Sequence, residues 1–174
     1  HTALRRQRQM CIRDRDYIDQ NYWALENNVI LIDEFLQNAK EVDVDVLRDN
    51  KGNTMIAGIM EHIEEAGIHS GDSACSIPPF SLNDKIISDI KKFSISLVNE
   101  LKILGLMNIQ YAIKDDEIFI LEANPRASRT IPFLAKAIGI PFIKIAAELI
   151  VGKTLTKEYQ NFDNNTLPYF AIKE

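Results

Sequence analysis

The chain has 174 residues, a hydrophobic fraction of 46% and a formal net charge of -5 at pH 7. This length suffices for one domain with a hydrophobic core, and the composition is that of a globular protein rather than a disordered one. No apolar run approaches the roughly 18 residues that a membrane span needs, and the acidic balance argues against nonspecific nucleic-acid binding. The two cysteines, Cys11 and Cys75, form neither a disulfide framework nor a metal-ligand pattern, which favours a cytoplasmic protein.

The first fifteen residues differ in composition from the rest of the chain. They hold five of the eight arginines, and the stretch RQRQMCIRDR resembles translated sequencing-adapter text. A nucleic-acid-binding tail is an alternative, but no aromatic or glycine-rich sequence accompanies the charge. We therefore expect residues 1–15 to be a non-native or disordered tail and residues 16–174 to form the domain.

The first half of this domain is predicted to contain strands. Residues 29–32 are a short apolar run, and residues 41–47 alternate valine with acidic residues. A turn cluster at residues 50–53 precedes another β-type run at residues 54–60, which predicts a hairpin. Residues 63–79 have no regular period and are rich in glycine and serine, so we expect an ordered loop with a functional role.

A long amphipathic helix is predicted to begin near Asp84, because apolar residues recur at helical spacing after it. Ser81 or Asn83 can cap its start, and Gly105 is expected to end it. Two shorter apolar helices are predicted later in the chain, at about residues 131–138 and 141–151.

The most regular strand pattern lies between these helices, on both sides of the acidic pair Asp115-Asp116. Odd-numbered apolar residues are expected to face a core, whereas Gln110 and Glu122 point to the opposite face. Pro125 ends the second strand. The sequence therefore predicts an α+β domain with an antiparallel sheet flanked by helices.

Polar side chains of complementary chemistry occupy alternate positions near the end of that strand: Glu122, Asn124 and Arg126. Carboxylate and amide oxygens suit a hard cation such as Mg²⁺, and a guanidinium group suits phosphate. Gln110 has the same parity on the partner strand and can bring another amide oxygen. The alternative is a solvated Glu122–Arg126 ion pair, with Asn124 shaping the turn that follows.

A shared site requires a particular register between the two strands. A two-residue turn at Asp115-Asp116 would set Gln110 against Leu121, on the wrong face. We therefore predict a three-residue connection or a bulge that pairs Gln110 with Glu122. This register places Phe119, Leu121 and Ala123 on the core face, and parity assigns Ala112, Ile118 and Ile120 to possible adenine contacts.

The loop at residues 67–73 is a second candidate site, because small residues beside His69 allow a sugar or phosphate to approach backbone amides. A surface histidine in a turn is the alternative interpretation. Cys75 is predicted to be a buried small residue without a chemical role.

Four phrases carry a family resemblance: EVDVD at residues 41–45, GIMEHIEEAGIHSGDSACSIPP at 58–79, GLMNIQYAIK at 105–114 and LEANPRASRTIPFLAKAIGIP at 121–141. In this order they resemble the carbamoyl-phosphate synthetase large subunit, which has two homologous ATP-grasp units. The sequence motifs are similar to those of the second unit, which phosphorylates carbamate. The resemblance implies a fragment equivalent to the C-terminal subdomain of an ATP-grasp fold, without the preceding subdomain or the regulatory domain.

The resemblance also implies roles for individual residues. Gln110, Glu122 and Asn124 would bind two Mg²⁺ or Mn²⁺ ions that bridge the ATP phosphates, and Arg126 and Arg129 would be the catalytic groups on the phosphoryl group or carbamate. Glu41 would bind the ribose, residues near 34–36 would lie along the adenine, and the 67–70 loop would close the pocket. The implied nucleotide-binding positions are Glu34, Leu36, Glu41, Gly67, Ile68, His69, Ser70, Gln110 and Glu122.

The implied activity is that of a ligase that uses ATP to phosphorylate carbamate to carbamoyl phosphate, within a glutamine- or ammonia-dependent synthase of arginine and pyrimidine biosynthesis. Implied partners are ATP, carbamate, the glutamine amidotransferase small subunit and the rest of the large subunit, with no nucleic acid or membrane. The fragment alone is expected to be inactive. Alternatives are another ATP-grasp carboxylate ligase or a non-catalytic nucleotide-binding module, in which Arg126 and Arg129 would be salt-bridged away from the metal residues.

Overall fold

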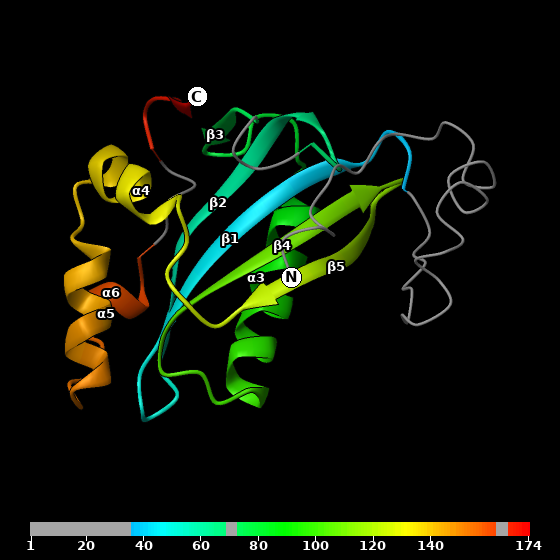
Figure 1. Ribbon diagram of the computed structural model, residues 1–174. Helices are drawn as coiled ribbons and strands as arrows, with labels where there is room; N and C mark the ends of the chain where they lie inside the picture. Colours follow the sequence, from blue (N-terminus) through cyan, green and yellow to red (C-terminus); the bar gives the residue numbers. More distant parts are fainter. Residues whose placement is uncertain (1–35, 69–72, 163–166) are drawn as a thin grey trace, which may run out of the picture. The chain divides into compact units, whose positions relative to one another are not determined.

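The computed structural model describes residues 36–68, 73–162 and 167–174. Residues 37–174 form one compact unit, whose strands and helices can be followed in Figure 1. The expected tail at residues 1–15 and the expected strand at residues 29–32 lie outside the described residues. None of the helices in the described part is long and apolar enough to cross a membrane.

The described strands form one six-stranded antiparallel sheet in the order β5-β4-β1-β2-β3-β6. The strands are β1 (Lys40–Arg48), β2 (Thr54–Glu65), β3 (Cys75–Ile77), β4 (Gly105–Lys114), β5 (Glu117–Asn124) and β6 (Ala171–Lys173). The helices are α3 (Asp84–Glu100), α4 (Ile131–Ile138), α5 (Phe142–Ile150) and α6 (Lys157–Gln160). The predicted α+β architecture with flanking helices is confirmed.

Each face of the sheet packs against different helices (Figure 1). On one face, Val42, Val44 and Val46 of β1 join a buried cluster with Ile86 and Ile90 of α3. On the other face, residues of α4 and α5 form a second buried cluster that includes Leu47. Because successive strand residues point to opposite faces, the acidic residues between the valines of β1 lie on the face opposite α3.

Two predicted boundaries are wrong. Residues 63–79 are not a continuous loop, because β2 extends to Glu65 and β3 lies within the segment. Helix α3 is capped by Asn83 as expected, its Oδ1 accepting a 2.9 Å hydrogen bond from the Ile86 amide, but it ends at Glu100. Gly105 instead begins β4, where its φ of 90° and the nearby Ile150 side chain disfavour a Cβ atom.

The β4–β5 hairpin combines the two registers considered from the sequence. Asp115 and Asp116 form a two-residue turn, both with positive φ, so the predicted three-residue connection is wrong. A bulge then leaves Leu121 without a partner and pairs Gln110 with Glu122, so the predicted bulge and pairing are confirmed.

The bulge changes the facing of the residues before it. Phe119 lies opposite Ala112, and Leu121 is 37% exposed, so neither occupies the core face as predicted. Ile118 lies opposite Ile113 and packs against the cluster beneath α3. The prediction of an adenine contact for Ile118 is therefore wrong, because it assumed that side chains alternate between the two faces without interruption, whereas the bulge at Leu121 interrupts this alternation.

Candidate functional site

A row of polar residues crosses three neighbouring strands on the face opposite α3. Asp43 of β1 lies directly opposite Gln110 of β4, and Gln110 lies directly opposite Glu122 of β5. Directly opposed residues of antiparallel strands have Cβ atoms about 4.5–5.5 Å apart. The register therefore makes neighbours of side chains that are far apart in sequence.

A second polar row runs parallel to the first, two residues along each strand. It consists of Asp45, Asn108 and Asn124, which are again direct cross-strand partners. The structure thus brings together the three residues predicted to bind metal, Gln110, Glu122 and Asn124. Gln110 and Asn124 are half-buried, and Glu122 is exposed.

These three side chains offer one carboxylate and two amide oxygens, a donor set that fits a hard cation. Among the described residues, no group of three or more His, Cys, Asp and Glu side chains can hold a metal ion. The buried Asn124 Nδ2 has no hydrogen-bond partner among the described residues.

Asp45 connects the sheet to the loop that follows β5. It is fully buried, and its Oδ1 accepts a 3.1 Å hydrogen bond from Asn108 Nδ2. Its Oδ2 accepts hydrogen bonds from the hydroxyls of Ser128 at 2.9 Å and Thr130 at 2.6 Å. Burial raises the pKa of Asp45 to about 6, although the three hydrogen bonds oppose this shift. The loop that carries both predicted catalytic arginines is therefore fixed at its base.

Arg126 and Arg129 are exposed on this loop. Arg126 Nη1 donates a 3.2 Å hydrogen bond to the backbone oxygen of Ala127. Within the described part of the chain, neither guanidinium group takes part in an ion pair. The arrangement in which both arginines are salt-bridged away from the polar rows is thus not seen among these residues.

Glu41, the expected ribose-binding residue, is buried at the end of the same acidic face of β1. Its Oε2 accepts a 3.2 Å hydrogen bond from the amide of Gly67, which joins it to the predicted nucleotide loop. Ile68 is exposed in that loop. Leu36 is half-buried and directly precedes the compact unit of residues 37–174. The other predicted nucleotide-binding residues, Glu34, His69 and Ser70, lie outside the described residues.

A buried hydrogen-bond network continues the first polar row and was not predicted from the sequence. His62 Nε2 lies 3.1 Å from Asp43 Oδ2, and His62 Nδ1 lies 2.9 Å from Ser73 Oγ. The Ser73 hydroxyl donates a 2.8 Å hydrogen bond to Glu64 Oε2, so it accepts from His62 Nδ1–H. Burial disfavours the charged imidazole, but the hydrogen bond and charge of Asp43 outweigh it and raise the pKa of His62. Hydrogen bonds at both ring nitrogens are those of an imidazolium.

The missed residues had a signal in the sequence. Alternation such as that of residues 41–47 is typical of one buried face and one solvent face, yet Glu41, Asp43 and Asp45 are 3%, 2% and 0% exposed. Asn108 and Gln110 of β4 lie opposite Asp45 and Asp43, so the polar character continues across the two strands. Only the strand pairing reveals this match.

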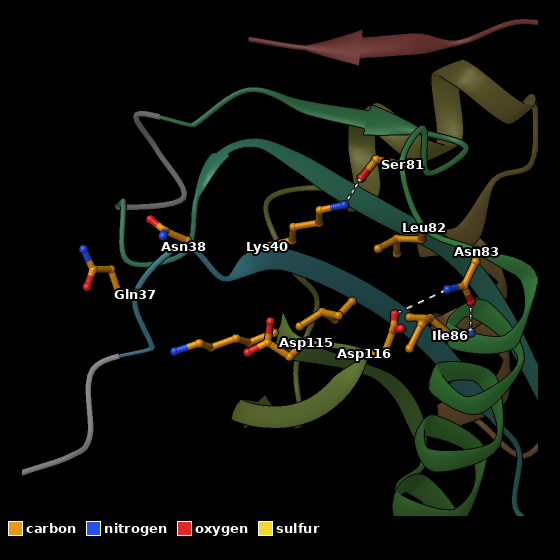
Figure 2. A pocket seen from close by; sticks show the side chains of 11 residues that line it. Gln37, Asn38, Lys40, Ser81, Leu82, Asn83, Ile86, Asp115 and Asp116 are labelled. Atoms are coloured by element: carbon orange, nitrogen blue, oxygen red, sulfur yellow. Dashed lines mark hydrogen bonds between the residues drawn. The ribbon is translucent and has the colours of Figure 1, made fainter.

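A separate cavity of about 410 Å³ lies on the other side of the sheet, beside the start of α3 (Figure 2). Its lining includes Lys40, Ser81, Asn83, Ile86 and Asp116. Ile86 belongs to the cluster beneath α3, so this cavity does not open onto the polar rows. None of the predicted site residues lines it, and we assign it no role.

Comparison with known proteins identifies the family. Residues 15–158 match the family model described as carbamoyl-phosphate synthase L chain, ATP binding domain. The chain belongs to this family. The match covers most of the chain and decides between this family and the other ATP-grasp ligases considered from the sequence.

Carbamoyl-phosphate synthase large chains are similar to the chain at high identity. The protein from Thermotoga neapolitana is 61% identical over 126 residues, covering 72% of the chain and 11% of the relative. The protein from Synechocystis is 60% identical over 146 residues, covering 83% of the chain and 13% of the relative. The protein from Xanthomonas axonopodis pv. citri is 49% identical over 164 residues, covering 91% of the chain and 15% of the relative. The chain thus spans 11–15% of the length of these relatives.

Solved structures show the same fold at low sequence identity. The biotin carboxylase beta-gamma-ATP complex from Campylobacter jejuni aligns with a TM-score of 0.67 and 15% identity, over 83% of this chain and 32% of that one. A pyruvate carboxylase from Rhizobium etli also aligns with a TM-score of 0.67 and 16% identity, over 80% of this chain and 13% of that one. The expected ATP-grasp-type α+β fold of this carbamoyl-phosphate synthase domain is confirmed.

Proposed function

We propose that the chain is part of the second ATP-grasp unit of a carbamoyl-phosphate synthase, where ATP and two Mg²⁺ or Mn²⁺ ions serve the phosphorylation of carbamate. The observation that carries this proposal is the pairing of Gln110 with Glu122 across the bulge at Leu121. Without the bulge, the two-residue turn would place Leu121 opposite Gln110. An irregularity in the ladder is thus what aligns the oxygen donors.

Each predicted site residue has a distinct task in this proposal. Glu122 supplies the carboxylate for the metal ions, and Gln110 and Asn124 supply neutral oxygens. Bound metal ions would neutralise charge on the ATP phosphates during transfer. Arg126 and Arg129, on the loop fixed by Asp45, would hold the transferring phosphoryl group or carbamate.

The nucleotide would lie along the rest of the acidic face. Glu41 would bind the ribose hydroxyls, and backbone groups of the loop beginning at Gly67 would approach the nucleotide. Their direct hydrogen bond supports this arrangement, because it already places the loop beside the carboxylate. In the same proposal His69 and Ser70 continue the loop, and Glu34 and Leu36 lie along the adenine.

The assignment to the second unit is supported by two sequence motifs above all, EHIEEAGIHSGDSACSIPP and NPRASRTIPF. It places the chain in a synthase that also includes the glutamine amidotransferase small subunit and serves arginine and pyrimidine biosynthesis. The chain by itself would bind ATP weakly and be inactive, because relatives of this family are far longer.

The test uses a full-length carbamoyl-phosphate synthase that carries this segment and measures ATP synthesis from carbamoyl phosphate and ADP. Glu122→Ala is expected to abolish this partial reaction, because the metal ions lose their carboxylate. Glu117→Ala is the matched control, since Glu117 is an exposed acid at the other end of β5. Near-normal partial activity of the Glu122→Ala enzyme would overturn both the metal assignment and the assignment to the carbamate-phosphorylating unit.

A further inference from the structure

Two acid–amide pairs stand side by side between β1 and β4. Asp45 lies opposite Asn108, and Asp43 lies opposite Gln110, with both pairs on the face away from α3. In the first pair the hydrogen bond is formed, from Asn108 Nδ2 to Asp45 Oδ1 at 3.1 Å. The first pair shows that a carboxamide on β4 can donate to the carboxylate opposite it on β1. The second pair has the same arrangement, two residues along each strand.

Asp43 is buried and only half satisfied. Its Oδ2 is held by His62 Nε2, while its buried Oδ1 has no hydrogen-bond partner in the part of the chain that the structure describes. A buried carboxylate oxygen without a donor is costly and indicates a missing contact. The nitrogens of the neighbouring side chains are already engaged, since Asn108 Nδ2 bonds Asp45 and His62 Nδ1 bonds Ser73. No side-chain hydrogen bond among the described residues fixes the amide of the cross-strand partner Gln110, so either end of it can turn toward Asp43.

We propose that Asp43 is a positioning residue for the cation site, whose Oδ1 accepts a hydrogen bond from Gln110 Nε2 and so leaves Gln110 Oε1 facing the cation. This inference rests on the proposed function, because it assumes that Gln110 is a metal ligand. A carboxamide has one acceptor end and one donor end, and a cation tolerates only the acceptor end. An ionised carboxylate can only accept, so Asp43 fixes which end faces outward.

His62 decides how a substituted residue 43 would turn. Its Nδ1–H donates to Ser73, which in turn donates to Glu64, so Nε2 carries a proton only on the imidazolium that Asp43 favours. In an Asp43→Asn variant that charge is gone, and Nε2 of the neutral ring would accept from the new NH₂ group. The carboxamide oxygen would then face Gln110 and hold it as Asp43 does. An Asp43→Leu variant has no acceptor, so neither end of the Gln110 amide is fixed.

The experiment is a double-mutant cycle on the 174-residue chain, with the Mn²⁺–ATP complex as the probe and protein-bound Mn²⁺ measured by equilibrium dialysis to millimolar concentrations. Asp43→Leu is expected to weaken Mn²⁺ binding by about tenfold or more. Asp43→Asn should keep most of the affinity, because its oxygen can still accept from Gln110. In a Gln110→Glu background Asp43→Leu should cost nothing, since either oxygen of the new carboxylate can bind Mn²⁺.

Equal losses of affinity from Asp43→Leu in both backgrounds, or no loss in either, would overturn the positioning role. Equal losses from Asp43→Leu and Asp43→Asn would also overturn it, because they would indicate that Asp43 acts through its charge or binds the cation itself. Glu122→Ala separates this inference from the proposed function. If it weakens Mn²⁺ binding while Asp43→Leu does not, only the inference fails. If the Glu122→Ala chain binds as tightly as the wild type, the cation site itself is wrong.

A measurement on the wild-type chain covers the case in which the Asp43→Leu variant does not fold. The side-chain NH₂ signals of Gln110 are identified in a ¹⁵N-correlated NMR spectrum by their loss in Gln110→Glu. Saturation with Mg²⁺ and ATP should shift one of these protons downfield and slow its exchange, as expected for donation to a buried carboxylate. Unchanged signals at saturation would overturn the inference.

Discussion

Thr130 donates a 2.6 Å hydrogen bond to the buried carboxylate of Asp45, which ties the central strand β1 to the loop between β5 and α4. The bond spans 85 positions of the sequence. It fixes the base of the segment that carries Arg126 and Arg129, while leaving both arginine side chains exposed. The position of these arginines therefore depends on a buried acid that makes no predicted contact with substrate.

The first prediction concerns the pH dependence of folding. Because the pKa of Asp45 rises from 3.8 to about 6 on folding, its contribution to stability is fully present below pH 3.8 and is lost as the pH rises to about 6. The loss corresponds to about 3 kcal/mol. Urea unfolding between pH 3.8 and about 7 should show that the stability advantage of the wild type over Asp45→Asn falls by about this amount. A constant difference across this range would contradict the raised pKa.

The second prediction concerns the hydrogen bond itself. Thr130→Val keeps the side-chain shape but removes the donor to a buried carboxylate, so the free energy of unfolding should fall by about 1.5–3 kcal/mol at pH 7. Thr154→Val is the matched control, because Thr154 is exposed, and should change stability by less than about 0.5 kcal/mol. Similar effects of both substitutions would show that the Thr130 hydroxyl does not support the fold.

The third prediction concerns the close approach of α4 to the sheet. A Cβ atom on Gly58 would lie 2.5 Å and 2.8 Å from the two methyl carbons of the buried Leu134. Gly58→Ala should therefore lower the free energy of unfolding by about 1–3 kcal/mol. Adding Leu134→Ala should give a double variant more stable than the sum of the two single effects. Strict additivity would indicate that α4 moves away from the sheet.

The fourth prediction separates catalysis from nucleotide binding alone. In a full-length synthase, Arg126→Met and Arg129→Met should each slow ATP synthesis from carbamoyl phosphate by roughly 100-fold to 1,000-fold, because each removes a donor to the transferring group. Mn²⁺ binding with ATP should change little. Lys136→Met, which removes a cation on α4, is the control. Unchanged rates in both arginine variants would favour a non-catalytic nucleotide-binding module.

Local patterns predicted much of this fold. The alternation in β1 and β4, the Asn83 cap and the apolar spacing of α4 and α5 were sufficient, because each depends on residues close together in sequence. Helix α3 ends earlier than predicted because Lys102 already has a left-handed conformation, with φ of 50°. An apolar spacing that continues past the last turn does not reveal this change.

The candidate site was predicted only in part. Gln110, Glu122 and Asn124 share a face as expected, because side-chain parity and one pairing requirement were enough to place them. The supporting residues were missed because their partners are distant: Asp43 meets His62 and Asp45 meets Thr130 only after β1, β2 and the later loop have packed. A strand pattern alone does not distinguish an acidic face in water from one covered by its own partners.

The bulge at Leu121 also bears on solubility. β5 is the outermost described strand on its side of the sheet, and its segment Ile118-Phe119-Ile120-Leu121 is continuously apolar. A flat, apolar outer strand offers unpaired backbone groups to other chains and promotes aggregation. The extra residue interrupts the regular spacing of those groups, and Glu117 and Glu122 place charges on both sides of the apolar run. The irregularity that aligns the oxygen donors thus also disfavours strand-to-strand association with neighbouring molecules.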